Sequence, residues 1–478
     1  MKITSNFSGI CSDIRFWILL FFLVRLIGIT NPPLEVAHNW RQTTVTMVAR
    51  NFLEVDNNIF FPRIDIAGNK TGITGMEFPL FNYLIYLMSL VFGYAHWYGR
   101  LINLIVSSVG IFFFYKLVIK YFDPKIAFYA AWIVLFSIWF AYSRKIMPDT
   151  FSMSLIFIGM YYSSNYLDSP SNGFRWKNLI LYTIFITLGI LTKLPAGYLP
   201  AIFLLFFLNP KIQVSRKIVF SAVSLICVLI PAIWYFYWTP RLVETYGFWH
   251  FFMGKDILEG FAEISQNLPQ TLNRFYESAI KYVGFGFFIF GLVVSIVKRE
   301  KLLIALFLIS FPLFLVTVFK AGYTFPHHSY YIIPFVPVMA LFAGFGISQI
   351  KSRKIVFIIL AAIALEGVLN HYDDFFIPEK QQVILNLEKD LDEVSNRNDL
   401  ILINSGYLPT PMYFAHRKGW VLPNEDILNQ KHLQELIDNG LRYIVIVKRT
   451  FGTPILLELP VVFENENYCI YRIVNRTE

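Results

Sequence analysis

The chain has 478 residues, of which 56% are hydrophobic, 18% are aromatic and only 15% are charged, and its formal net charge is +9. A soluble domain carries about 25% charged residues, and a chain of this length needs a large polar surface to fold in water. These figures exclude a disordered chain, a collagen, a disulfide scaffold and an ordinary soluble enzyme, and they predict a protein that crosses the membrane several times.

The basic residues lie in short clusters between apolar runs. Membrane proteins mark their cytoplasmic loops in this way, whereas a nucleic-acid-binding domain gathers its positive charge on one surface. The excess of positive charge therefore predicts orientation in the membrane, and no nucleic-acid partner is expected. The three cysteines have neither metal-ligand nor redox spacing, so no disulfide framework is expected either.

Eleven apolar runs are candidates for membrane spans, since a helix needs about 20 apolar residues to cross the hydrocarbon core. The first apolar run, Phe16 to Ile29, follows Arg15 and lacks a small-residue cleavage site, so we expect a retained span rather than a signal peptide. Two short runs flank a break at Thr192-Lys193-Leu194-Pro195. The expected spans are 14–30, 99–119, 125–143, 150–167, 178–192, 195–209, 217–238, 279–297, 301–319, 329–350 and 354–371.

The basic clusters predict how these spans are oriented. If all of these clusters are cytoplasmic, successive spans cross the membrane in alternating directions and the other connections face outward. This gives a cytoplasmic N-terminus and an extracytoplasmic C-terminus. This topology requires that a further apolar run, 78–92, lies along the outer interface, and its Asn82, Tyr83, Tyr86 and Ser89 suit that place. The clusters are Lys2 with Arg15; Lys116, Lys120 and Lys125; Arg175 with Lys177; Lys211, Arg216 and Lys217; Lys298, Arg299 and Lys301; and Lys351, Arg353 and Lys354.

Three segments face outward in this topology, and each is longer than an ordinary loop. The first is expected to hold two interfacial helices, the run 78–92 and residues 40–52, whose Trp40, Thr44, Val48 and Phe52 recur at helical spacing. The second carries an aromatic cluster over 248–252, of a kind that seeks the membrane interface. The three segments are 31–98, 239–278 and 372–478.

The last outward segment is polar and charged, unlike the rest of the chain. Helical and strand patterns alternate along it, which predicts a small α/β domain. We therefore expect a transmembrane domain over 1–371 and a small extracytoplasmic α/β domain over 372–478. The predicted elements are a helix at 378–395, a strand at 399–404, a helix at 430–439 and a strand at 442–448.

Ionisable residues gather at the outer ends of the spans rather than within them. A channel or pump would carry such groups inside its spans, so their scarcity there counts against a transporter. The candidate site residues are Glu35, His38 and Arg41 after the first span, Glu77 before the run 78–92, Arg144 and Asp149 between the third and fourth spans, Lys193 at the break, and His327, His328 and Tyr330 at the tenth span.

Such a set suits the transfer of a group from a lipid phosphate. A carboxylate or imidazole accepts the proton of an attacking hydroxyl, and Arg or Lys stabilises the charge growing on the leaving phosphate. Glu35, His38, Glu77 and Asp149 are therefore candidate catalytic groups, and which of them is the base stays open. The other candidates are expected to bind substrate phosphate. The ordinary alternatives are acids at helix starts and cations anchored to lipid headgroups.

A series of short motifs runs between about residues 14 and 345: Ala49-Arg50-Asn51-Phe52, Glu77-Phe78-Pro79-Leu80, Gly99-Arg100-Leu101, Tyr142-Ser143-Arg144 with Met147-Pro148-Asp149, Thr192-Lys193, and Tyr330-Tyr331 with Pro334 and Pro337. In order and spacing they resemble the polyprenyl-phosphate-sugar-dependent glycosyltransferases of the GT-C superfamily, particularly the bacterial aminoarabinose transferase and protein mannosyltransferase group. The resemblance implies a GT-C fold with interfacial helices in the first outer loop. It also implies inverting transfer of a sugar from a polyprenyl-phosphate carrier at the outer face.

One position departs from the pattern of this family. Many members carry an Asp-Glu pair in the first outer loop, shortly before the equivalent of Ala49, where this chain has Arg41-Gln42. The nearest acid is Glu35, and His38 is an alternative base. Related sequences with a His-x-Trp-Arg-Gln stretch form a subgroup, so the change is not interpreted as a loss of activity.

The chain is accordingly expected to be a multi-pass enzyme of the cell (inner or plasma) membrane. Its expected partners are a polyprenyl-phosphate-linked sugar donor, membrane lipids, and an acceptor that is a lipid, a glycan or a protein. No cofactor is expected, and no ligand spacing indicates a metal ion, since the adjacent His327 and His328 form a poor chelate. The alternatives are a lipid or polysaccharide transporter and a polysaccharide polymerase or ligase.

Overall fold

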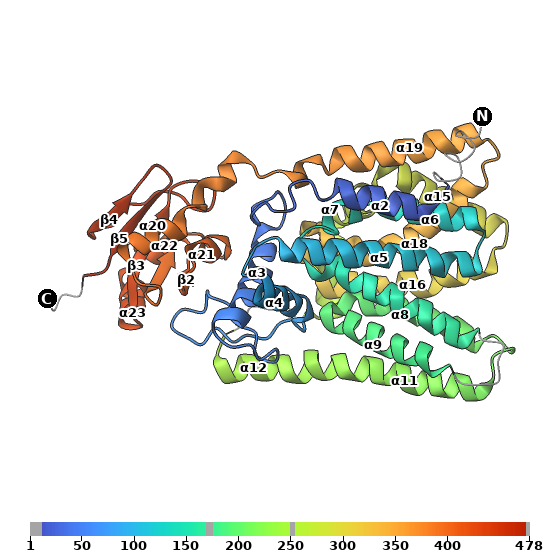
Figure 1. Ribbon diagram of the computed structural model, residues 1–478, viewed down its shortest axis with the longest axis horizontal. Coiled ribbons are helices and arrows are strands. Elements are labelled where there is room, and N and C mark those ends of the chain that lie inside the picture. Colours follow the sequence, from blue (N-terminus) through green and yellow to red (C-terminus); the bar gives the residue numbers. More distant parts are fainter. Residues whose placement is uncertain (1–11, 169–174, 249–253, 475–478) are drawn as a thin grey trace. The chain divides into compact units, whose positions relative to one another are not determined.

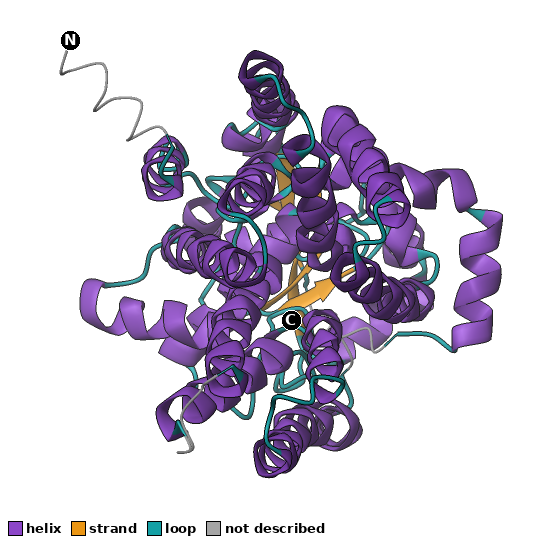
Figure 2. Ribbon diagram, turned by 90° about the vertical axis from the view of Figure 1, so that its right-hand side faces the viewer, coloured by secondary structure: helices purple, strands orange, loops and turns teal. Residues whose placement is uncertain are grey.

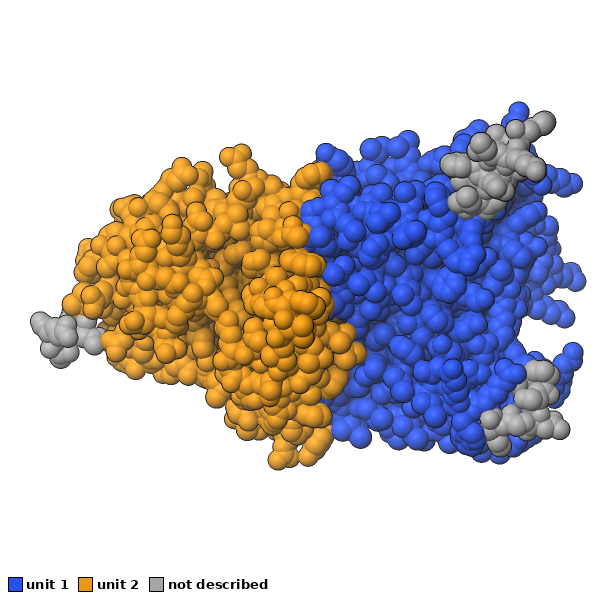
Figure 3. All heavy atoms as spheres, in the orientation of Figure 1, with its two compact units in different colours: residues 1–29, 100–236, 252–372 blue, residues 30–99, 237–251, 373–478 orange. Residues whose placement is uncertain are grey.

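The computed structural model describes residues 12–168, 175–248 and 254–474, so Lys2 and residues 249–252 of the aromatic cluster lie outside the described residues. The chain divides into two compact units, which Figure 3 shows in different colours. One unit boundary falls after Tyr372, while the assignment of 372–478 as a domain of its own stays a prediction. Unit 1 is formed by residues 1–29, 100–236 and 252–372, and unit 2 by residues 30–99, 237–251 and 373–478.

Unit 1 is helical, and its long helices run side by side (Figure 1); Figure 2 looks along them. Each predicted apolar run forms helical structure. The α-helices are α2 (Ile14–Val24), α5 (Tyr98–Tyr121), α6 (Pro124–Phe136), α7 (Trp139–Tyr142), α8 (Pro148–Leu167), α9 (Trp176–Thr192), α10 (Leu204–Phe207), α11 (Val214–Ile233), α13 (Ile257–Gln266), α14 (Leu268–Asn273), α15 (Lys281–Val297), α16 (Lys301–Ala321), α17 (Thr324–His327), α18 (Val336–Ser348) and α19 (Arg353–Asn370).

Four helices of the described chain are long and apolar enough to cross a membrane, and two further bent pairs bring the number to six if each pair is one span. The 24 residues of α5 rise about 36 Å, which exceeds the hydrocarbon thickness of about 30 Å. A helical multi-pass membrane fold is therefore confirmed, while the number of eleven spans and the orientation of the termini stay predictions. The four helices are Tyr98–Tyr121, Val214–Tyr246, Lys301–Ala321 and Ser329–Ser348.

Several spans are interrupted by tighter or wider helical turns. At the predicted break, Lys193 is extended (φ −156°, ψ 106°), and the ten residues of η1 (Leu194–Phe203) form a 3₁₀-helix with Pro200 inside it. Proline removes a backbone donor and disrupts the α-helical ladder, and a 3₁₀-helix of this length is unusual. The other interruptions in unit 1 are the π-turns η2 (Trp234–Trp238) and η3 (Arg274–Ala279) and the 3₁₀-helix η4 (Ser329–Phe335).

Glycines allow α18 to approach its neighbours closely in unit 1. A Cβ on Gly291 of α15 would overlap the carbonyl oxygen of Phe342, and a Cβ on Gly344 of α18 would lie 2.8 Å from the backbone nitrogen of Ala130 in α6. Helices in lipid associate through such close packing of small residues, because no hydrophobic force drives them together. The contacts of α18 with α15 at Gly291 and with α6 at Gly344 therefore admit no larger residue at these two positions.

We expect Gly291→Val to lower the melting temperature of the detergent-purified protein, because overpacking of a close helix contact costs about 1–3 kcal/mol. Gly286→Val in the same helix is the control, since a Cβ at Gly286 meets no atom within 4 Å. Thermal unfolding followed by size-exclusion chromatography would measure both variants. An equal decrease of the melting temperature in the two variants would contradict a close backbone contact at Gly291.

Unit 2 contains a five-stranded sheet in the order β2-β1-β3-β5-β4. Strand β1 pairs in parallel with β2 and β3, and β5 pairs antiparallel with β3 and β4. This arrangement confirms the small C-terminal α/β fold, in which only the first and third strands were predicted. The strands are β1 (Leu400–Ile403), β2 (Gly419–Val421), β3 (Leu441–Val447), β4 (Val461–Glu464) and β5 (Tyr468–Arg472).

Helices cover this sheet and extend through the rest of unit 2. They include the helices predicted at 40–52, 78–92, 378–395 and 430–439. In chain order they are α3 (Asn39–Glu54), α4 (Leu80–Phe92), α12 (Thr239–Tyr246), η5 (Tyr372–Phe375), η6 (Glu379–Ile384), α20 (Leu387–Val394), α21 (Thr410–Ala415), α22 (Asn424–Leu428) and α23 (Gln430–Asp438).

Helix α3 is buried from Arg41 to Phe52, on every side rather than on one. One side packs on α4, where the Asn82 side chain donates to the carbonyl of Val45 at 2.9 Å. Another side packs on the C-terminal segment, where Met47 joins the hydrophobic core beside β1 and α21. The helix forms where its apolar spacing predicts it, but the second packing partner comes from a part of the chain that the spacing cannot indicate.

His416 joins three elements of unit 2. Its Nε2 lies 2.8 Å from Glu54 at the end of α3, and its Nδ1 lies 2.8 Å from Glu388 in α20. Burial lowers the pKa of His416, but the hydrogen bonds to Glu388 and Glu54 outweigh it and raise the pKa above the ordinary 6.5. The hydrogen bond from His416, together with Arg397, lowers the pKa of Glu388 to about 2.

This raised pKa makes part of the stability of unit 2 depend on pH. The contribution of His416 is fully present below its unfolded pKa of about 6.5 and is lost as the pH rises through the folded value. We expect the melting temperature to fall more steeply above pH 6.5 in the wild type than in His416→Asn, which cannot ionise. Asn also tolerates the left-handed backbone at this position, where φ is 47°. The control is His432→Asn, and parallel pH profiles of wild type and His416→Asn would contradict the prediction.

Candidate functional site

The sequence-predicted site residues divide between the two units. Glu35, His38, Arg41 and Glu77 belong to unit 2, and the other six belong to unit 1. Each set is described within its own unit.

Glu35 and His38 lie in the loop that leads into α3. The Glu35 side chain is 0% exposed, and His38 is half-buried at the N-cap of the helix. Ala37 and His38 both adopt the left-handed conformation, with φ of 61° and 58°. Each such residue costs roughly 1–2 kcal/mol, and strain of this kind concentrates at functional sites. The loop therefore fixes the direction in which the His38 imidazole leaves the backbone.

Arg41 and Glu77 form a buried ion pair through Nη2 and Oε1. Arg41 lies in the first turn of α3 and Glu77 precedes α4, so the pair also ties these two helices together. The guanidinium engages the Glu77 carboxylate directly. The guanidinium, in turn, keeps a fixed orientation and has further N–H donors for another anion. The geometry suits Glu77 to orienting Arg41 better than to removing a proton.

In unit 1, Asp149 and Lys193 form a second buried pair. Asp149 is the second residue of α8, and its Oδ1 lies 3.5 Å from Nζ of Lys193. Asp149 is only 4% exposed, and its buried Oδ2 has no hydrogen-bond partner among the described residues. Nζ of Lys193 also lies 5.3 Å from the centre of the Tyr330 ring, which is a cation–π contact. The carboxylate therefore has one oxygen near a cation and one oxygen available for a proton.

His328 adds an imidazole to this cluster. Its ring stacks on the Tyr330 ring, with centroids 5.4 Å apart and planes inclined by 15°. Burial lowers the pKa of His328, and the charges of His327, Arg274 and Lys193 lower it further. A neutral imidazole that donates one hydrogen bond is the expected form near pH 7. The neighbouring His327 is exposed, and its ring lies 4.2 Å from that of Tyr323.

The turn before α8 is held by Asn103, which the sequence reasoning missed. Asn103 in α5 donates from Nδ2 to the carbonyls of Tyr142, Lys145 and Met147 at 2.9, 2.8 and 3.2 Å. Its Oδ1 accepts a hydrogen bond from Thr150 at 3.0 Å. These contacts fix the turn and the first residues of α8. An asparagine inside an apolar run is the signal that could have identified it.

Arg144 lies fully buried in the same turn. A second buried cation, Arg25 at the end of α2, donates from Nη1 to Ser143 at 2.8 Å. The hydroxyl of Tyr142 pairs with Ser329 of η4 at 2.7 Å, which links the turn to the segment that carries His328 and Tyr330. Arg25 was also missed, although an arginine within the first apolar run is a marker of function or of a buried partner.

These clusters can bind anionic oxygen and move a proton. Unit 1 supplies a carboxylate, an ammonium and a neutral imidazole around one tyrosine ring, and unit 2 supplies a guanidinium fixed by a carboxylate. Within residues 12–168, 175–248 and 254–474, no group of three or more His, Cys, Asp or Glu side chains is placed to hold a metal ion.

Comparison with known protein families gives one match. Residues 77–235 match the family model of the dolichyl-phosphate-mannose-protein mannosyltransferases, a range that includes Glu77, Asp149 and Lys193. No curated protein sequence matches the chain.

Solved structures share the fold. ArnT from Cupriavidus metallidurans, bound to undecaprenyl phosphate, aligns with a TM-score of 0.57 and 10% identity over 95% of this chain and 98% of that chain. The oligosaccharyltransferase of Archaeoglobus fulgidus in the apo form aligns with a TM-score of 0.55 and 13% identity over 90% of this chain and 70% of that chain. The same enzyme tethered to an acceptor peptide with an NVT sequon aligns with a TM-score of 0.54 and 14% identity over 90% of this chain and 69% of that chain. Together the family match and the shared architecture confirm the resemblance seen in the sequence: the chain is a membrane protein with the fold of the GT-C glycosyltransferase superfamily.

Proposed function

We propose that this protein is a membrane glycosyltransferase. It moves a sugar from a polyprenyl-phosphate-linked donor to an acceptor at the outer face of the membrane and inverts the anomeric carbon. The observation that carries the proposal is the buried pair of Asp149 and Lys193, at 3.5 Å, beside Tyr330. The match to dolichyl-phosphate-mannose-dependent transferases and the likeness to ArnT bound to undecaprenyl phosphate support a lipid-phosphate donor.

The proposed reaction is a single displacement. The acceptor hydroxyl attacks the anomeric carbon on the side opposite the phosphate, and the new carbon–oxygen bond forms while the bond to the phosphate oxygen breaks. The electron pair of the broken bond leaves with the polyprenyl phosphate, and the hydroxyl proton passes to a carboxylate. Attack from the opposite side is the reason that the configuration inverts.

We assign the leaving phosphate to the cationic cluster of unit 1. In unit 1 the Lys193 ammonium stabilises the charge that grows on the phosphate, and neutral His328 and Tyr330 supply further donors. Arg144 is proposed as an additional phosphate ligand in unit 1. Within unit 2, Arg41, held in orientation by Glu77, is proposed to bind a phosphate oxygen of the substrate. The exposed His327 is given no part in the chemistry.

We assign the role of base to Asp149. Its Oδ1 lies beside the Lys193 ammonium, and Oδ2 is the oxygen that takes the proton. Glu77 is the weaker candidate because its carboxylate is held by Arg41. Glu35 and His38 are the alternatives that the variants below distinguish from Asp149.

The direct test is transfer by the purified protein from labelled polyprenyl-phosphate sugars, followed as release of polyprenyl phosphate. Asp149→Asn is expected to lower kcat by about 10²–10⁴-fold with little change in donor affinity, because it removes the proton acceptor but keeps the shape. Glu259→Gln, in the exposed part of α13, is the matched control and keeps full activity. Lys193→Gln is expected to lower both kcat and donor affinity.

Other outcomes of this experiment contradict the assignment in different ways. Full activity in Asp149→Asn combined with inactivity in Glu35→Gln or His38→Asn would move the base to the loop before α3. Absence of transfer from every single-sugar donor, with transfer from a donor that carries an oligosaccharide, would favour a polymerase or ligase. Absence of transfer from both kinds of donor would contradict the proposed function.

The Arg41–Glu77 pair gives a separate prediction. If Glu77 only orients Arg41, Glu77→Gln raises the KM for the donor more than it lowers kcat. The double variant Arg41→Gln/Glu77→Gln is then no worse than Arg41→Gln alone, because the two residues act as one unit. A loss of kcat in Glu77→Gln at unchanged KM would instead identify Glu77 as a catalytic group.

A further inference from the structure

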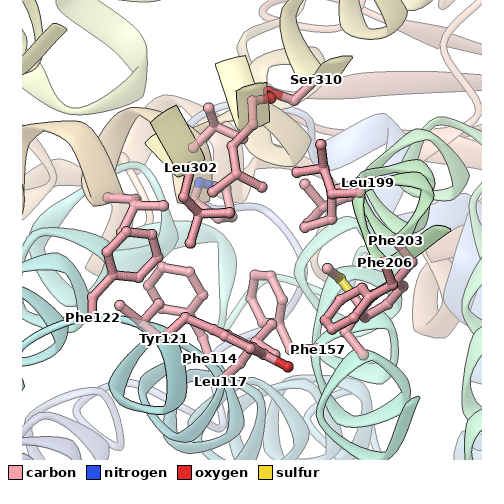
Figure 4. Close-up of a pocket in the computed structure, with 18 of the residues that line it drawn as sticks. Phe114, Leu117, Tyr121, Phe122, Phe157, Leu199, Phe203, Phe206, Leu302 and Ser310 are labelled. Atoms are coloured by element: carbon pink, nitrogen blue, oxygen red, sulfur yellow. Dashed lines mark hydrogen bonds between the residues drawn. The ribbon is translucent and has the colours of Figure 1, made fainter. Parts of the chain in front are cut away.

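A cavity of about 290 Å³ lies in unit 1 among α5, α8, η1, α10, α16 and α18. Figure 4 shows the rings of Phe114 and Phe157 and the side chains of Leu199 and Leu302 directed toward one another around it. An apolar cavity of about 150 Å³ is enough to bind benzene. The present cavity is about twice as large, and its apolar walls suit a segment of hydrocarbon chain rather than a sugar or a phosphate.

The cavity is distant from the proposed catalytic cluster along the same helices. Asp149 begins α8, whereas the cavity is lined by Phe157 and Met160 farther along α8 and by Asp168 at its end. Asp168 follows Asp149 by 19 residues, or about 29 Å along a helix axis. Along α8, the cavity therefore lies toward the end opposite Asp149.

Exposure identifies the open end of the cavity. Phe114, Phe157 and Leu199 are buried, whereas Leu302 at the start of α16 is 41% exposed and Asp168 is also exposed. Asp168 accepts hydrogen bonds from Lys120 at 3.0 Å and from Tyr121 at 2.5 Å, so this side of the opening is polar. The cavity thus opens where α5 and α8 end and α16 begins.

Two lysines lie close in sequence to residues that line the cavity. Exposed Lys211 lies two residues beyond the lining residue Asn209, and exposed Lys301 directly precedes Leu302. Both lysines belong to clusters that the charge pattern predicts to be cytoplasmic. An apolar cavity with a polar side to its opening and exposed lysines next to its lining residues in the sequence matches the two parts of an anionic lipid, its chain and its phosphate.

We propose that this cavity binds one acyl chain of an anionic glycerophospholipid from the leaflet beside these clusters, and that Lys211 and Lys301 hold its phosphate. The proposal commits to a phospholipid rather than to the polyprenyl donor, because the opening lies at the opposite end of α8 from Asp149. It is independent of the proposed function, since its test measures lipid binding and not sugar transfer.

The test uses native mass spectrometry of the full-length protein after delipidation, with phosphatidylglycerol as the probe. Leu302→Trp narrows the opening and Leu306→Trp fills the interior, and each is expected to weaken binding at least about tenfold in Kd. Leu308→Trp is the control, because this side chain of the same helix is 66% exposed and does not line the cavity. Leu302 is partly exposed, so its replacement tests the cavity even if Leu306→Trp fails to fold.

A second pair of measurements tests the lysines. Lys211→Gln/Lys301→Gln is expected to remove the preference for phosphatidylglycerol over phosphatidylcholine with the same chains, whereas Lys354→Gln keeps it. Equal binding of the two lipids by the wild type would overturn the role of the lysines. An equal loss of phosphatidylglycerol binding in Leu308→Trp and Leu302→Trp would overturn the cavity as the binding site. If Leu302→Trp weakens the binding of polyprenyl phosphate but not that of phosphatidylglycerol, the cavity would be assigned to the donor chain and the proposal overturned.

Discussion

The absence of water from the hydrocarbon core constrains this structure more than any single contact. Backbone groups there must be satisfied within the chain, so spans are helical and irregular backbone persists only where side chains replace the missing partners. The turn before α8 shows how this is done: the amide of Asn103 donates to three carbonyls of the turn, those of Tyr142, Lys145 and Met147. The candidate groups of unit 1 lie at such places. Asp149 follows that turn, Lys193 is the extended residue between α9 and η1, and Tyr330 lies in the 3₁₀-helix η4.

Two ion pairs contain candidate site residues, and they differ in a way that bears on chemistry. A buried pair gains little net stability, because desolvation offsets the attraction between the charges, so its retention points to orientation of the groups. Arg41 and Glu77 are in direct contact, and each is fixed by the other. Asp149 and Lys193 are 3.5 Å apart, and the second oxygen of Asp149 is not engaged by any described residue. The first pair suits binding, and the second retains an oxygen for proton transfer.

Local patterns in the sequence were sufficient for most of the helices and for part of the sheet. Long apolar runs such as Lys301–Ala321 and strands such as Leu441–Val447 can be predicted from their composition and from the spacing of their hydrophobic residues. Pairings between distant segments do not. The contact of Arg41 with Glu77 joins two helices, the burial of α3 on every side depends on the C-terminal segment, and the three-residue strand β2 is too short to show a period. Lys193 was singled out by the break beside it, whereas Asn103 and Arg25 were overlooked because each is one polar residue in an apolar run.

The 3₁₀-helix η1 connects the two halves of unit 1 in a way that an α-helix of the same length would not. It rises about 2.0 Å per residue instead of about 1.5 Å, so its ten residues extend about 20 Å. Its first residue follows Lys193, and its later residues Leu199, Ile202 and Phe203 line the cavity. Because η1 forms part of the cavity wall and begins directly after Lys193, the packing of this wall and the 3.5 Å spacing of Lys193 from Asp149 depend on the same stretch of backbone. A change of volume at Leu199 therefore acts on the spacing of the two charged groups as well as on the cavity itself.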